Sequence, residues 1–120
     1  MATDMKNLEK LPALNASAPE AANAFWAFDK AALAPGAIPK KYKELMAVAV
    51  ALTTQCPYCI EVHRQGALKS GVTEQELGEA VFVAAALRAG AAVTHGTHLL
   101  ADTRQEVHGS PMLATAVDHA

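Results

Sequence analysis

The sequence lacks the features that are typical of nucleic-acid-binding and membrane proteins. Its 120 residues include two cysteines, 5% aromatic residues and 18% charged residues, and the formal net charge is −2. Such a small charge, with Lys and Arg scattered along the chain, argues against the basic patch that nucleic acids or anionic membranes require. No apolar run approaches the ~20 residues that span a bilayer, and the first residues form no apolar signal segment. We therefore expect a soluble, cytoplasmic protein with no nucleic-acid or membrane partner.

Alanine is what the chain has in abundance. Hydrophobic residues make up 52% of the sequence, and most of their side chains are small. Because alanine favours helices and is depleted in strands, the composition predicts close-packed helices. The length suits one domain with a real core. We expect a single all-α domain over residues 1–120, a compact bundle of about five to six helices.

Proline, glycine and capping residues divide this domain into segments. Each expected helix begins near a proline or a capping residue, or ends at a glycine or at a Pro- and Gly-rich stretch. The expected helices cover about 19–33, 39–55, 57–70, 74–90 and 92–107. Because residues 1–16 mix Pro, Asn and Ser without a helical period, we expect a loosely ordered lead-in there. We also expect the other end, 109–120, to be loosely ordered or to form a short helix.

Two of the expected helices are apolar around nearly their whole circumference, over residues 45–52 and 80–93. The first of these stretches has the pattern of a fully buried helix. A subunit of this size surrounds only about one helix completely, so the other helix must be covered elsewhere. Small alanine side chains also let helices of different subunits approach closely. We therefore expect a symmetric homo-oligomer.

Both cysteines lie close to a histidine in the stretch QCPYCIEVH, residues 55–63. Pro57 suits the first position of a helix, which makes Cys56 the flanking N-terminal residue. Cys59 and His63 are then four residues apart on one helix face. The unpaired N–H groups and the positive dipole end of a first turn lower the pKa of a thiol from its usual ~8.5. The stretch thus supplies a thiolate, a proton-handling imidazole and a second thiol that can close a disulfide.

Other interpretations of these three residues stay open. Free cysteines are often small buried hydrophobes. Cys56, Cys59 and His63 are also three potential zinc ligands in a non-catalytic metal-binding or assembly module, with His95 or His98 as the fourth. Against zinc, a structural zinc site usually supports a chain too poor in core to fold alone. CPYC also matches the glutaredoxin motif, but that fold places the motif after a strand, whereas helical sequence flanks it here.

Together with Glu44, the stretch reads Glu-x11-Cys-x2-Cys-x3-His. Residues 43–80, KELMAVAVALTTQCPYCIEVHRQGALKSGVTEQELGEA, strongly resemble the core of alkylhydroperoxidase D-like proteins in the carboxymuconolactone decarboxylase family. The resemblance extends over about 19–103 and implies an all-helical subunit that forms trimers or hexamers and reduces peroxides without a bound cofactor. By the same resemblance, Cys59 is the peroxidatic thiol and Cys56 the resolving thiol, while His63 and Glu44 form the proton relay.

The resemblance has further implications for activity and partners. It implies a peroxide substrate and an external dithiol reductant, a lipoyl-bearing or thioredoxin-like protein. True lactone decarboxylases of the family typically lack the cysteine pair, so decarboxylation is not expected. The best-known peroxidases carry a histidine where this chain has Tyr58. The alternative is therefore a thiol-disulfide oxidoreductase without strong peroxidase activity.

Helix geometry gives an independent prediction for Glu44. If helices 39–55 and 57–70 form an antiparallel pair that turns at Gln55, Glu44 lies eleven residues from the turn, His63 eight and Cys59 four. At ~1.5 Å rise per residue, Glu44 is offset along the axis by ~4.5 Å from His63 and by ~10 Å from Cys59. We therefore expect Glu44 to contact His63, in the relay order Glu44, His63, Cys59. The alternative is a first-turn acid that only complements the helix dipole.

Overall fold

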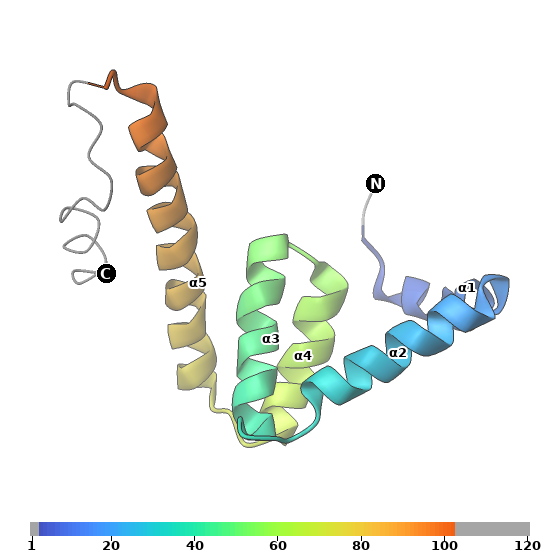
Figure 1. Cartoon of the computed structure of the whole chain (residues 1–120). Coiled ribbons are helices and arrows are strands. Elements are labelled where there is room, and N and C mark those ends of the chain that lie inside the picture. The colour runs from blue at the N-terminus through green and yellow to red at the C-terminus, as the bar shows by residue number, and fades with distance from the viewer. Residues whose placement is uncertain (1–2, 103–120) are drawn as a thin grey trace. The chain divides into compact units, whose positions relative to one another are not determined.

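A computed structural model describes residues 3–102, and every regular element within that range is helical (Figure 1). The elements are the 3-10 helix η1 (Met5–Lys10), α1 (Leu11–Ser17), α2 (Pro19–Leu33), α3 (Lys40–Thr54), α4 (Pro57–Lys69), α5 (Glu74–His95) and the 3-10 helix η2 (Gly96–Leu99). The predicted all-α fold is confirmed, and α2, α3 and α4 begin at or next to the prolines expected to start them. By its internal contacts the chain divides into two units, residues 1–89 and 90–120.

The N-terminal segment is more regular than we predicted, because residues 5–17 form η1 and α1 instead of a loosely ordered lead-in. Asp4 caps η1, since its carboxylate accepts a hydrogen bond from the Lys6 N–H at 2.9 Å. Pro12 lies in the first turn of α1, where the N–H that it lacks would have no helical partner. Capping residues and first-turn prolines give the same mixed composition as a loop. The other expected loose end, 109–120, lies outside the described residues.

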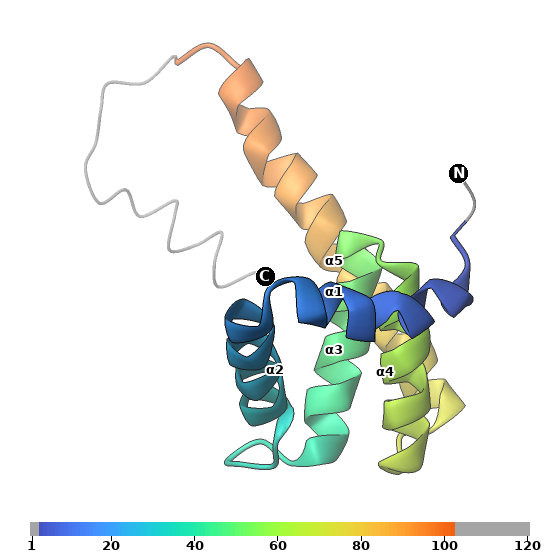
Figure 2. The same ribbon diagram turned by 90° about the vertical axis from the view of Figure 1, so that its right-hand side faces the viewer.

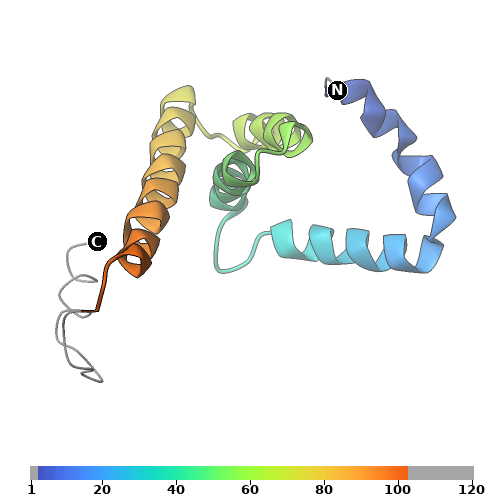
Figure 3. The same cartoon turned by 90° about the horizontal axis from the view of Figure 1, so that it is seen from above.

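Helices α3 and α4 form an antiparallel pair (Figure 2). The chain reverses at Gln55, which adopts the left-handed conformation with φ 57°. The Cys56 N–H then bonds to the Ala51 carbonyl at 3.2 Å. Seen from above, α3 and α4 lie side by side (Figure 3). The turn therefore lies where the sequence predicted it and brings the middle of α3 against α4.

The buried core of the first unit is small. Val48 of α3, Ala67 of α4 and Val72 are buried against each other. A Schellman motif ends α4, because the Val72 N–H bonds to the Ala67 carbonyl at 3.0 Å and the Gly71 N–H to the Leu68 carbonyl at 3.1 Å. Gly71 has φ 93°, which confirms the predicted left-handed cap. This turn directs Val72 back onto α4.

Helix α5 begins as predicted but does not end as predicted. Thr73 and Glu76 form the expected capping box, with reciprocal hydrogen bonds of 2.9 and 3.1 Å. The predicted stop at Gly90 is wrong, and so is a separate helix starting at 92, because α5 continues to His95. A glycine inside a helix costs about 1 kcal/mol relative to alanine, which the alanine-rich sequence on both sides tolerates.

Large apolar side chains remain exposed on α3 and α5. Val50 of α3 is 59% exposed, and Phe82 and Leu87 of α5 are 76% and 67% exposed. The prediction that residues 45–52 are fully buried is therefore wrong for a single copy of the chain. Residues 74–99 are also long and apolar enough to cross a membrane by length and composition, with a hydropathy of 1.5. This corrects the expectation that no apolar run approaches that length.

Candidate redox site at the N-terminus of α4

The two cysteines lie at the start of α4. Pro57 is the first residue of the helix, and Cys56 is its N-cap, with an extended backbone. The Cys56 sulfur accepts a hydrogen bond from the Cys59 N–H at 3.3 Å, as the side-chain oxygen of a serine or aspartate does at many helix starts. Both thiols are free; Cys56 is half-buried and Cys59 is exposed. External molecules can therefore reach Cys59.

The sulfur atoms of Cys56 and Cys59 lie 2.8 Å apart. The two thiols are hydrogen bonded to each other, and this bond, supported by the Cys59 N–H, lowers the pKa of Cys56. The same hydrogen bond raises the pKa of Cys59, together with partial desolvation and the negative charges of Cys56 and Asp29. The expected lowering of thiol pKa by the helix terminus thus holds for Cys56 only. Once one thiol of an adjacent pair has ionised, the second ionises less readily, because a second negative charge beside the first is unfavourable.

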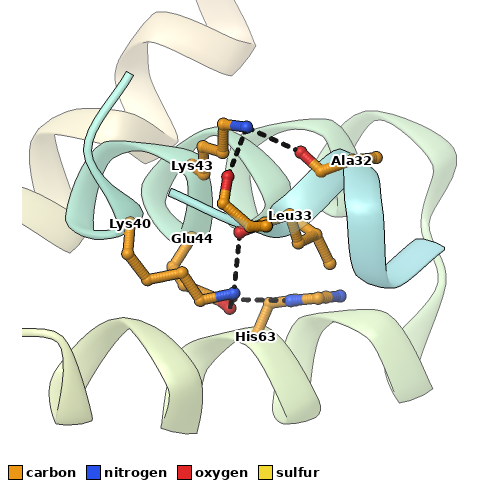
Figure 4. Close-up of polar contacts among 7 residues, drawn as sticks. Ala32, Leu33, Lys40, Lys43, Glu44 and His63 are labelled. Carbon is orange, nitrogen blue, oxygen red and sulfur yellow. Dashed lines mark hydrogen bonds and ion pairs between the residues drawn. The ribbon is translucent and has the colours of Figure 1, made fainter. Parts of the chain in front are cut away.

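His63 contacts Glu44 across the α3–α4 pair (Figure 4). The His63 Nδ1 lies 2.8 Å from the Glu44 Oε2, which confirms the predicted contact. An ionised carboxylate only accepts hydrogen bonds, so Nδ1 carries the proton and donates it. The other ring nitrogen, Nε2, is then the atom left to exchange a proton with a partner.

Glu44 is a buried charge with a partner on each oxygen. It is only 5% exposed, and its Oε1 accepts from the Lys40 Nζ at 3.0 Å while Oε2 accepts from His63. Burial raises the pKa of Glu44, but the hydrogen bonds and charges of His63 and Lys40 outweigh it, so the pKa is lowered overall. Glu44 is therefore a carboxylate at neutral pH. The first-turn alternative is wrong, because Glu44 lies beyond the first turn of α3 and its side chain binds α4.

The lowered pKa of Glu44 predicts an acid-dependent loss of stability. The folded-state pKa lies below the ordinary value of 4.5, so the contribution of Glu44 is complete above about pH 4.5. It is lost as the pH falls through the folded-state pKa. We expect Glu44→Gln to be less stable than the parent in urea unfolding at pH 7, by about 1 to 3 kcal/mol, and this difference to shrink below pH 4.5. A difference that stays constant down to pH 3 would contradict this assignment.

Gly66 of α4 makes room for the Glu44 carboxylate. A Cβ at this position would lie 2.8 Å from Glu44 Oε2 and 2.9 Å from its carboxyl carbon, which is closer than such atoms approach. A Cβ at Gly78 of α5, by contrast, would meet nothing within 4 Å. The close contact at Gly66 is therefore specific to its position beside Glu44, because the helical glycine Gly78 has no such neighbour.

We expect Gly66→Ala to displace Glu44 from His63. Urea unfolding should show Gly78→Ala stabilised by up to about 1 kcal/mol through helix propensity. At Gly66 the same gain is offset by overpacking of about 1 to 3 kcal/mol, so this variant should be the less stable of the two. Equal stabilisation of both variants would show that Glu44 moves aside without cost.

The structure groups the four predicted site residues into two contacting pairs, Cys56 with Cys59 and Glu44 with His63. Within residues 3–102, no cluster of three or more His, Cys, Asp or Glu residues is arranged to hold a metal ion. The rings of His95 and His98 lie 6.0 Å apart at the end of α5 and in η2.

Three neighbours of the site were not predicted from the sequence. Lys40 and Gly66 contact Glu44, and Asn7 of η1 donates a hydrogen bond to the Tyr58 hydroxyl at 3.0 Å. Lys40 precedes Glu44 by four residues, and this spacing on a helix is a readable sign of an ion pair. Nothing in the sequence marks the contacts of Gly66 and Asn7.

The fold and the site thus define an all-helical protein with a thiol pair at a helix N-terminus and a buried Glu–His pair. The sequence model of the carboxymuconolactone decarboxylase family matches residues 19–102. The chain is 36% identical to a carboxymuconolactone decarboxylase family protein from Legionella pneumophila, whose apo crystal structure aligns with a TM-score of 0.63 over 67% of this chain and 71% of that chain. This chain belongs to the carboxymuconolactone decarboxylase family, and the predicted family resemblance is confirmed.

Two further relatives are bacterial proteins. Compared with the Legionella protein, one is more similar in sequence and the other matches over a longer stretch. A Paracoccus denitrificans protein named "Uncharacterized protein 4 in cox locus" is 51% identical over 79 residues, which cover 66% of this chain and 71% of the relative. An uncharacterized protein from Cupriavidus necator is 31% identical over 106 residues, covering 84% of this chain and 94% of the relative. Neither name gives an activity.

Proposed function

We propose that the protein is a cysteine peroxidase that reduces hydroperoxides by cycling Cys56 and Cys59 between dithiol and disulfide. The observation that carries this proposal is the contact of 2.8 Å between two free thiols at a helix N-terminus. Membership of a family that includes alkylhydroperoxidase D-like peroxidases supports it. Both electrons come from the thiols, so the reaction requires no bound cofactor.

The first chemical step needs a thiolate on the attacking sulfur. When the thiol pair loses one proton, the negative charge forms on Cys56; transfer of the remaining proton from Cys59 to Cys56 across the sulfur contact then moves the charge to Cys59. This transfer costs about 1.4 kcal/mol per unit of pKa difference. The Cys59 thiolate then attacks one peroxide oxygen, so that an S–O bond forms and the O–O bond breaks. In this proposal His63 first takes up the proton that the thiol pair loses on ionisation, then gives this proton to the leaving alkoxide or hydroxide, while Glu44 holds the ring.

The second step closes the disulfide. The Cys56 sulfur attacks the sulfenic acid on Cys59, an S–S bond forms, and the oxygen leaves as water. One hydroperoxide and two thiols thus give one disulfide, one alcohol and one water. An external dithiol, of the lipoyl-bearing or thioredoxin-like class that the family resemblance suggests, then reduces the disulfide. The exposure of Cys59 gives such a partner access to a sulfur atom. Because free thiols persist in a reducing compartment, we propose a cytoplasmic location.

A second candidate function is thiol-disulfide exchange without strong peroxidase activity. Tyr58 favours it, because this residue replaces the histidine of the best-known peroxidases and its hydroxyl already accepts a hydrogen bond from Asn7. A substrate panel separates the two functions. The reduced protein is mixed with hydrogen peroxide, an organic hydroperoxide or a small disulfide, and a dithiol reductant recycles it. Faster turnover of a hydroperoxide supports the peroxidase, and turnover of the disulfide alone supports exchange.

We also propose that copies of the chain assemble through the apolar surface of α3 and α5. An open groove of about 420 Å³ between these helices is lined mainly by apolar side chains, including Leu45, Met46 and Val83. A lipid bilayer is a less favourable environment for α5 than a second copy of the chain. Arg88 lies within the apolar stretch and donates a hydrogen bond to the Thr53 carbonyl. A charged residue at the centre of a bilayer costs about 2.5 to 3.5 kcal/mol. A second copy covers the apolar surface without that cost.

Assembly is expected to be visible by light scattering in detergent-free buffer. We expect a single species at a multiple of 12.6 kDa, a trimer or hexamer as in the family, across a dilution series. Phe82→Asp, which places a charge at a 76% exposed apolar position, should shift the protein towards smaller species. A well-folded 12.6 kDa species of the parent down to micromolar concentration would contradict assembly. Recovery of the protein on lipid vesicles would instead favour a membrane contact.

A further inference from the structure

The Glu44–His63 pair is part of a longer network that begins at Lys40 (Figure 4). Lys40 lies one turn before Glu44 on α3, and its Nζ lies 3.0 Å from Glu44 Oε1. The same Nζ donates to the Leu33 carbonyl at the end of α2, also at 3.0 Å. Lys40 is therefore fixed by two acceptors and binds the carboxylate oxygen that His63 does not use.

The charges of the three side chains balance only when the imidazole is neutral. Lys40 contributes one positive charge and Glu44 one negative charge, so a neutral His63 gives a sum of zero. Without Lys40 the sum is −1, and a proton taken up by His63 would restore neutrality. A protonated imidazole has no free nitrogen to accept a thiol proton. The side chain of Glu44 is only 7% exposed, so water screens these interactions poorly.

We propose that Lys40 is a positioning residue that neutralises Glu44 from the side opposite His63 and thereby keeps the His63 ring neutral and correctly oriented. Its importance for peroxide reduction rests on the proposed function, but its effect on His63 does not. On α4 itself, Glu61 and Arg64 form an exposed ion pair of 3.8 Å and offset each other. Asp29 of α2 acts on Cys59. Lys40 and Glu44 are thus the charged groups that α3 presents to this network.

Lys43 provides a matched control for Lys40. It lies on the same helix, and its Nζ bonds to the carbonyls of Ala32 and Ala34 at 2.9 and 2.6 Å. Both lysines therefore tether α3 to the end of α2, while the ion pair with Glu44 involves Lys40. If the role of Lys40 were only to hold α2, the two lysines would be equivalent.

The test is an NMR titration of the His63 ring in the reduced full-length protein, with the resonance assigned from a His63→Gln variant. We expect Lys40→Met to move the titration midpoint up by about half a unit or more, because the unpaired carboxylate then favours the imidazolium. Glu44→Gln should move the midpoint down, because it removes the negative charge. Lys43→Met and Lys40→Arg should leave the midpoint close to that of the parent.

The opposite signs separate an electrostatic role from a structural one. Loss of packing alone would expose His63 and separate it from Glu44, which moves the midpoint down and not up. An unchanged or lower midpoint in Lys40→Met, or the same shift in Lys43→Met, would overturn the inference. The titration requires no substrate, so an upward shift in a protein that does not consume peroxide would support the role of Lys40 and contradict the proposed function instead.

Discussion

Cys59→Ser is expected to abolish peroxide consumption, with a loss of at least ~10³-fold relative to the parent. A serine hydroxyl at this position is neither ionised nor able to form a sulfenic acid. Cys56→Ser should behave differently, because Cys59 still attacks the peroxide but no second thiol closes the disulfide. This variant should consume about one equivalent of peroxide per subunit and then stop, with a sulfenic acid that a specific probe traps. Stopped-flow peroxide consumption and mass spectrometry of the trapped product measure both results.

The reverse pattern would exchange the roles of the two thiols. Cys56 is the first of the pair to ionise, since the hydrogen-bonded contact with the Cys59 sulfur and the hydrogen bond from the Cys59 N–H lower its pKa. A sulfenic acid trapped on Cys56 in the Cys59→Ser variant would therefore identify Cys56 as the attacking sulfur. The assignment of attack to Cys59 follows from the family resemblance, and this pair of variants decides it.

His63→Gln is expected to give the second-largest effect, a fall of about 10²- to 10⁴-fold in the rate of peroxide reduction at neutral pH. Glutamine retains hydrogen-bonding capacity towards Glu44 but does not accept and release a proton. Glu44→Gln leaves the ring in place without its anionic partner, so its effect should be smaller than that of His63→Gln. Initial rates across a pH series measure these effects.

Glu61→Gln is the matched control for the relay. Glu61 lies on α4 close to His63 in the sequence, but its carboxylate bonds to Gln65 at 3.0 Å on the exposed surface. The same change of charge at Glu61 should alter the rate little, because exposed ion pairs and hydrogen bonds contribute weakly. Equal losses in Glu44→Gln and Glu61→Gln would show that general charge, and not the contact with His63, determines the rate.

Much of the site could be predicted because regular elements position it. Pro57 fixes the start of α4 and Gln55 the turn before it, so simple helix rise placed Glu44 opposite His63. The order in which the thiols ionise could not be predicted in this way. It depends on which sulfur accepts the hydrogen bond across a contact of 2.8 Å, and the conformations of both side chains set that contact.

Two of the errors in the predicted fold have a common physical origin. Gly90 and the composition of residues 1–16 were interpreted from local preference, which amounts to about 1 kcal/mol per residue and is easily outweighed by flanking helix-forming sequence. The burial predicted for residues 45–52 failed for another reason. A fully apolar stretch shows that a surface must be covered, but not whether the same chain covers it. Val50, at 59% exposed, is an example.

The central claim is that Cys56 and Cys59 form a disulfide when the protein reduces a peroxide. The most direct measurement is mass spectrometry of the fully reduced protein after one equivalent of hydroperoxide, followed by peptide mapping. We expect a loss of about 2 Da, one peptide link between Cys56 and Cys59, and full recovery of the thiols with a dithiol reductant. A protein that keeps its reduced mass, or gains oxygen on a single cysteine without forming the link, would contradict a Cys56–Cys59 redox disulfide.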